Sequence, residues 1–138
     1  MNWSTLWAAI SAVSTCATAI VAAWAMLRWR KQEELKAKMA FKSSIADYMN
    51  ILLYLPTEIV NAHVRARNID KLNELSESIK ACYHAWLITE GLLESNVVIK
   101  KCWDDLSNQH KEYISGKISS SILGAHCMGI LHEKFIFK

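Results

Sequence analysis

The most distinct feature of the hydrophobic pattern is an apolar run at the start of the chain. Residues 1–27 carry no charged side chain, and residues 4–24 read STLWAAISAVSTCATAIVAAW. An apolar run of about 20 residues is long enough to cross the hydrocarbon core of a bilayer as a helix. The pattern therefore predicts one transmembrane helix over residues 1–29.

Helical periodicity also dominates the rest of the chain, which has four Gly and one Pro in all and no strand-like alternation. RWRKQEELKAKMAFK, residues 28–42, is rich in helix-forming residues and is expected to continue the first helix. Pro56 is expected to kink or restart the helix. Apolar positions on this extension are Leu35, Met39, Ile45, Met49 and Leu52.

Three further helices are expected after Pro56. Asn68 or Asp70 caps the first and Ser95 or Asn96 the second, while Ser115 and Gly116 interrupt the pattern before the third. The predicted apolar faces are Leu72, Leu75, Ile79, Cys82, Trp86, Thr89 and Leu93; then Val98, Cys102, Leu106 and Tyr113; then Ile118, Ile122, Ala125 and Leu131.

The predicted fold class is therefore all-α, with a single N-terminal transmembrane helix that continues into a small cytosolic helical bundle. The domain boundaries are a transmembrane helix over 1–29, a juxtamembrane helix over 30–55 that continues into the bundle, and the bundle itself over 56–138. About 95 residues beyond the basic segment are enough for one hydrophobic core.

Charge is concentrated directly after the apolar run. Residues 28–42 hold six Lys or Arg and two Glu, a net charge of +4, whereas residues 43–138 carry a net charge of −1. Basic residues favour the cytoplasmic side of a span, so we expect the N-terminus outside and the C-terminus in the cytoplasm. A basic cluster confined to one border does not form a nucleic-acid groove, and direct nucleic-acid binding is not expected.

Tryptophans mark both ends of the run. At helical rise, Trp7 and Trp24 are about 25 Å apart and Trp3 and Trp29 about 39 Å apart. These separations bracket the hydrocarbon core and the headgroup region, where Trp is enriched. The predicted interface anchors are these four Trp together with Arg28, Arg30 and Lys31.

Two alternatives to a transmembrane helix are open. Ala23, Trp24 and Ala25 resemble a signal-peptide cleavage site, but the basic residues follow the apolar run instead of preceding it. A buried helix of a soluble protein is the second alternative, although four Trp in one such helix would be unusual.

Small and hydroxyl side chains are segregated on the apolar run. At 100° per residue, one line of the helix carries Ser4, Ala8, Ser11, Thr15, Thr18 and Ala22, which we call the small-residue seam. The opposite side carries Leu6, Val13, Ala17, Ile20, Trp24 and Leu27. Such seams allow close helix–helix contact in membranes and predict a homo-oligomer. The alternative is a monomeric transmembrane helix, in which the Ser and Thr hydroxyls donate to backbone carbonyls of the same helix.

Candidate reactive residues form no catalytic or metal-binding motif. Cys82 with His84, and His126 with Cys127, point in different directions on a helix and lack the usual zinc spacing. Adjacent Asp104 and Asp105 do not face each other and are expected on a solvated face. We therefore expect no catalytic residue, no metal and no cofactor; the thiols beyond the span are expected to be buried and reduced, and Trp86 and Trp103 to be core anchors.

The layout resembles small bacterial inner-membrane proteins that have an Ala-rich N-terminal anchor, a basic border of the type LRWRKQ (Leu27 to Gln32) and a cytosolic helical domain. Proteins of this type occur as effectors in toxin and anti-phage modules, including retron systems. The resemblance implies a non-enzymatic protein of the bacterial inner membrane that perturbs the membrane. Its partners would be the lipid bilayer, further copies of itself and a cytosolic protein. A passive tether is the alternative, and a membrane-anchored enzyme is the least favoured class.

Overall fold

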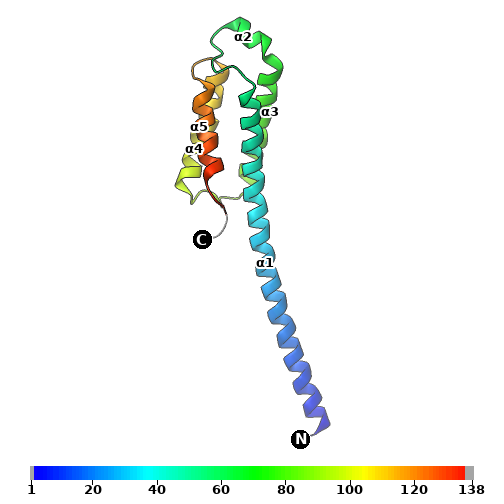
Figure 1. The fold of residues 1–138 in the computed structure, drawn as a ribbon. Helices are drawn as coiled ribbons and strands as arrows, with labels where there is room; N and C mark the ends of the chain where they lie inside the picture. Colours follow the sequence, from blue (N-terminus) through cyan, green and yellow to red (C-terminus); the bar gives the residue numbers. More distant parts are fainter. Residues whose placement is uncertain (1, 136–138) are drawn as a thin grey trace. The chain divides into compact units, whose positions relative to one another are not determined.

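The computed structural model describes residues 2–135, and every regular element in that range is helical. In chain order these are α1 (Trp3–Leu53), α2 (Ala62–Arg67), α3 (Ile69–Ile88), α4 (Val97–Ile114) and α5 (Ser120–His132) (Figure 1). The all-helical prediction is confirmed. The chain divides into two compact units, residues 1–35 and 36–138, and each is described separately below.

Helix α1 is continuous over 51 residues, which confirms that the basic segment continues the first helix. It ends at Leu53, three residues before Pro56, which lacks the amide that would bond to the carbonyl of Leu52; the amide of Leu55 bonds to this carbonyl instead. Its residues 3–35 form the first unit, and every residue from 2 to 34 is exposed.

In the second unit, residues 36–53 of α1 pack with α3, α4 and α5 around one hydrophobic core. The helices alternate in direction: Phe41 contacts Trp86 and Trp103, whereas Tyr54, near the other end, meets Lys71 of α3. The largest fully buried side chains of this core are Tyr48, Tyr113, Phe41, Ile45, Ile59, Leu75, Ile99, Leu106, Leu123 and Ile130.

An aromatic cluster closes one end of this core. The rings of Trp86 and Trp103 stack with centroids 5.7 Å apart, and Phe41 lies 5.1 Å from the first and 5.4 Å from the second. Tyr83 meets Trp103 edge-on at 5.0 Å. Aromatic pairs in this geometry add about 0.5–1.5 kcal/mol beyond the area they bury. The prediction that Trp86 and Trp103 are core anchors is confirmed.

The buried face of α3 agrees with the predicted pattern, since Leu72, Leu75, Ile79 and Cys82 are all buried. The predicted cap is only partly right. Asn68 occupies the N-cap position, but its side chain donates to the carbonyl of Val64 at 2.9 Å instead of capping α3. The short helix α2, which precedes it, was not predicted.

Helix α4 begins as predicted, and most of its predicted apolar face is correct, since Leu106 and Tyr113 are buried and Cys102 packs against the core. The Asn96 carboxamide oxygen accepts from the amides of Val98 and Ile99 at 3.1 and 3.2 Å, so this cap is confirmed. The prediction that Val98 faces the core is wrong, because Val98 is exposed and Ile99 is buried. The buried line is Ile99, Trp103, Leu106, His110 and Tyr113.

The face predicted for the last helix is only partly right, because Ile118 and Leu131 pack against the core but Ala125 is exposed. Ile122 is exposed, while Leu123, Cys127 and Ile130 are buried. Gly129 explains part of the close approach between α4 and α5, because a Cβ added there would lie 2.7 Å from the Sγ of Cys102. The predicted break between these helices is correct: Ser115 is the C-cap of α4, and Gly116 follows with a φ of 79°.

Candidate functional site: the exposed apolar part of α1

The first part of α1 is long and apolar enough to cross a membrane, and none of its most apolar stretch is buried in the structure. This stretch is therefore not part of the hydrophobic core that the described chain forms. Soluble monomers rarely expose continuous apolar surface on this scale, and such a surface marks an interaction site.

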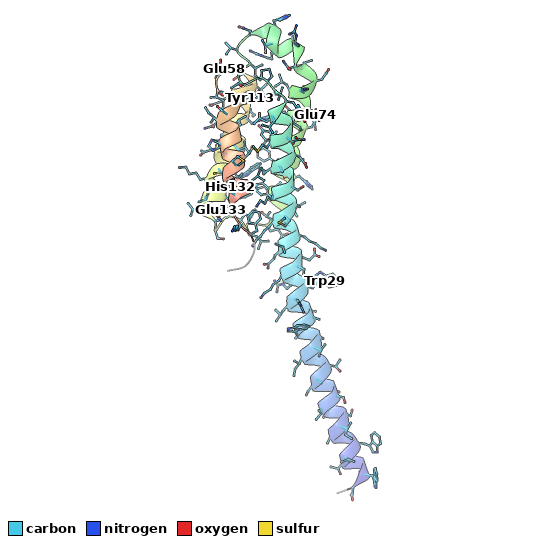
Figure 2. The ribbon with its side chains drawn as sticks, viewed as in Figure 1. Trp29, Glu58, Glu74, Tyr113, His132 and Glu133 are labelled. Carbon is cyan, nitrogen blue, oxygen red and sulfur yellow. The ribbon has the colours of Figure 1, made fainter. Side chains whose placement is uncertain are left out.

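The predicted interface anchors lie at both ends of this stretch and project from the helix. Trp3 and Trp7 are 76% and 63% exposed, and Trp24 and Trp29 are 59% and 68% exposed (Figure 2, where Trp29 is labelled). Indole rings favour the zone between hydrocarbon and water. Their placement as membrane-interface anchors stays a prediction.

The basic border begins within one turn of Trp24. The guanidinium carbon of Arg28 lies 5.0 Å from the centroid of the Trp24 ring, which is a cation–π contact. Arg30 and Lys31 are exposed. Residues 1–32 contain no carboxylate, since the first acidic residue of the chain is Glu33.

Hydroxyl groups in the middle of α1 are satisfied by their own helix. Thr15 donates to the carbonyl of Ser11 at 2.9 Å, Thr18 to that of Ser14 at 2.8 Å, and Ser14 to that of Ile10 at 2.9 Å. These are the local bonds expected of a span that stands alone. Each hydroxyl oxygen keeps a lone pair that can accept a bond from a neighbouring helix, so the small-residue seam stays a prediction.

The cysteine thiols of the second unit have structural roles. Burial raises the pKa of Cys82 to about 11 and that of Cys127 to about 12, and it also raises the pKa of Cys102. All three thiols are therefore protonated at neutral pH and poorly nucleophilic. None of the four cysteines is in a disulfide, and the Cys82 thiol donates to the carbonyl of Ser44 at 3.2 Å.

One buried polar pair was not foreseen from the sequence. The hydroxyl of Tyr48 and Nδ1 of His110 are 2.9 Å apart, and both side chains lie in the core. Burial, with a smaller contribution from Lys111, lowers the pKa of His110 to about 4, so its ring is neutral at pH 7. The two residues are 62 positions apart in the sequence, and no local pattern connects them.

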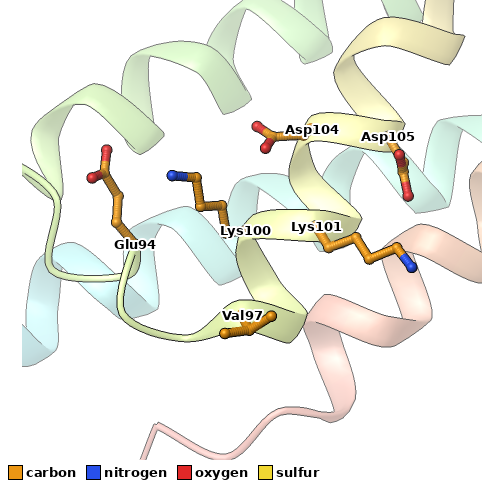
Figure 3. Close-up of a pocket in the computed structure, with 6 residues that line it drawn as sticks. All are labelled: Glu94, Val97, Lys100, Lys101, Asp104 and Asp105. Carbon is orange, nitrogen blue, oxygen red and sulfur yellow. The ribbon is translucent and has the colours of Figure 1, made fainter.

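A shallow surface pocket is lined by three acidic side chains, among them the adjacent Asp104 and Asp105. Glu94, Asp104 and Asp105 line it together with Lys100 and Lys101, and Figure 3 shows Lys100 extending toward Glu94. Glu94 and Asp104 are exposed and Asp105 is half-buried. Alternating charges at an open surface are typical of a solvated helix face.

The His and Cys groups considered for metal binding also stay apart. Within residues 2–135, no three side chains of His, Cys, Asp or Glu converge closely enough to hold a metal ion. His126 instead pairs with Gln109 through Nε2, at 3.1 Å. In the described part of the chain, the exposed apolar segment of α1 is the feature that most strongly indicates an interaction.

Comparison of the chain with protein-family models, with curated proteins and with solved structures gives no match.

Proposed function

We propose that this protein is a single-pass protein of the bacterial inner membrane, anchored by the apolar part of α1. The observation that carries the proposal is that this part of α1 is uncharged through residue 27, bordered by Trp at both ends and exposed along its whole length. The basic border at residues 28–31 favours a cytoplasmic location for the second unit.

The proposal includes self-association through the small-residue seam. Ser11, Thr15 and their neighbours on this line have side chains short enough to allow a second helix close to the backbone. The segregation of small side chains from Val13, Ile20 and Leu27 supports this assignment. The assembled form would perturb the membrane, as expected of an effector in a toxin or phage-defence module.

The second unit would bind a regulatory protein. Large apolar side chains are exposed where α1 ends and in the segment that leads to α2: Leu53 is 71%, Tyr54 67% and Val60 62% exposed. A partner that covers these side chains would bury surface that the chain itself leaves in water.

A passive tether is the second candidate, and the hydroxyl bonds within α1 favour it. Because Thr15 and Thr18 are already satisfied by carbonyls of the preceding turn, the span does not need a second helix. In this case the membrane helix would hold the second unit at the bilayer, and any unrelated span would replace it.

Leucine substitutions on the two sides of α1 separate these candidates. Ser11→Leu with Thr15→Leu adds bulk on the small-residue seam and makes the span more apolar, so insertion is retained. An assembling effector should lose self-association in membrane crosslinking, and induced expression should no longer arrest growth or lower the membrane potential. The matched control, Val13→Leu with Ile20→Leu on the opposite side, should behave as the wild type.

The tether predicts a different result. Both pairs of variants should then behave alike in crosslinking, and replacement of the whole span by an unrelated anchor should preserve function. Equal behaviour of the two faces would overturn self-association through the seam, whereas recovery of the protein without detergent would overturn the membrane anchor itself.

A further inference from the structure

Three side chains at the end of the apolar run share one side of α1. At 100° per residue, Trp24, Arg28 and Lys31 fall within about 60° of one another around the helix axis. Arg30, in the same turn, lies about 100° away from Lys31 and further from Arg28. We call Trp24, Arg28 and Lys31 the headgroup triad.

The headgroup triad lies on the side of α1 that carries Val13, Ile20 and Leu27, away from the small-residue seam. If the seam meets another helix, this is the side that meets lipid. The positions of Arg28 and Lys31 along the helix also agree with the depth of the headgroup region. Arg28 and Lys31 follow Trp24 by about 6 and 10 Å of helical rise, and the polar zone extends about 5–8 Å beyond the hydrocarbon on each side of a bilayer.

We propose that Trp24, Arg28 and Lys31 form a binding site for the phosphate of an anionic phospholipid. This inference rests on the proposed function, in which the apolar part of α1 spans the membrane. The indole occupies the boundary with the acyl chains, and Arg28 and Lys31 reach the phosphate from one and two turns further along the helix.

Arg28 is oriented for this role by its contact with Trp24, at 5.0 Å from the ring centroid. Stacking of a guanidinium on an indole leaves its edge free to donate two parallel hydrogen bonds to a phosphate. Lys31 supplies a second positive charge on the same side. No carboxylate precedes residue 33, so no acidic side chain lies within the triad or on the span before it.

The test uses the full chain in nanodiscs of phosphatidylcholine with one fifth phosphatidylglycerol. After extraction with mild detergent, native mass spectrometry measures the ratio of the two lipids that stay bound. A single Lys or Arg next to an anionic lipid surface strengthens binding to that surface by about fivefold. The wild type should therefore retain phosphatidylglycerol about fivefold or more above its share in the disc, and inorganic phosphate at millimolar concentration should not displace it.

Arg28→Gln and Arg30→Gln form a matched pair, because each removes one positive charge within the same turn. Arg28→Gln should lose most of the enrichment, Arg30→Gln should keep it, and Arg28→Lys should keep only part, since an ammonium cannot bond in a bidentate manner. Equal loss in Arg28→Gln and Arg30→Gln would overturn the triad in favour of a diffuse charge effect. Absence of enrichment in a correctly inserted wild type would overturn it as well.

Failure of the anchor itself gives a separate result, because the wild-type chain would then not enter nanodiscs of either composition.

Discussion

Removing the titratable ring of His110 should flatten the dependence of stability on pH. In the folded chain this ring lies in the core, with Nδ1 2.9 Å from the hydroxyl of Tyr48. Burial disfavours the charged imidazolium and lowers the pKa of His110 from 6.5 to about 4. The unfolded chain therefore binds a proton at His110 at a higher pH than the folded chain does.

The sign and size of the effect follow from this difference. The pKa of His110 is lower in the folded chain than in the unfolded chain. The neutral ring therefore makes its full contribution to stability above pH 6.5, and this contribution is lost as the pH falls toward 4. At 1.36 kcal/mol per pH unit, the interval from 6.5 to about 4 corresponds to about 3 kcal/mol. This is a large share of the ~5–15 kcal/mol that stabilises a typical domain.

The assay is guanidinium unfolding of the full chain in detergent micelles between pH 7.5 and pH 4, followed by near-ultraviolet circular dichroism of the packed aromatic cluster. His110→Asn keeps an acceptor near the position of Nδ1 but does not titrate. Between pH 7.5 and pH 4, the unfolding free energy of the wild type should fall by about 3 kcal/mol more than that of His110→Asn. His84→Asn, at an exposed position on α3, is the matched control and should retain the wild-type dependence.

Carboxylates contribute to acid unfolding in all of these proteins, so only the difference between variants is diagnostic. Parallel curves for the wild type and His110→Asn would refute the argument that burial of this ring controls part of the acid sensitivity.

Substitutions on α4 and α5 give further predictions for the same unfolding assay. Gly129→Ala should destabilise the chain, because its Cβ would meet Cys102 Sγ at 2.7 Å, and Cys102→Ala should rescue it; failure of the rescue would refute the contact. Gly124→Ala should stabilise by up to about 1 kcal/mol, because nothing lies within 4 Å of the added Cβ and Ala favours a helix over Gly. Asn96→Ala should cost about 1 kcal/mol through loss of the N-cap, and an equal loss in the exposed Asn108→Ala would contradict this assignment.

The sequence predicted the long first helix and its end well, because composition and Pro56 act locally. The same holds for the cap at Asn96, whose oxygen needs only backbone amides two and three residues further on. Local signals of this kind do not depend on how the helices are later arranged.

Which residue of a consecutive apolar run faces the core was predicted less well. Val97, Val98 and Ile99 are three consecutive apolar residues, and a choice wrong by one residue turns the predicted face by about 100°. On α5, exposed Ile122 and buried Leu123 are likewise adjacent and equally apolar. Which of them faces the core depends on the neighbouring helices.

Pairs that are distant in sequence were not predictable at all. The bond between Tyr48 and His110 and the close approach of Gly129 to Cys102 arise only when separate helices meet. For the candidate site, the anchors and the small-residue seam stay predictions from the sequence, whereas the contact between Arg28 and Trp24 was visible only in the structure.

Labelling of cysteines in intact membrane vesicles tests the transmembrane placement of α1 most directly. Cys16 is exposed on the isolated chain and lies midway along the apolar run, and Asn2→Cys and Gln32→Cys place thiols beyond its two ends. With a membrane-impermeant maleimide and site identification by mass spectrometry, the account predicts protection of Cys16 until detergent is added. It also predicts labelling of Asn2→Cys and Gln32→Cys from opposite sides of the membrane. Labelling of Cys16 as fast as Gln32→Cys, or of both ends from one side, would contradict it.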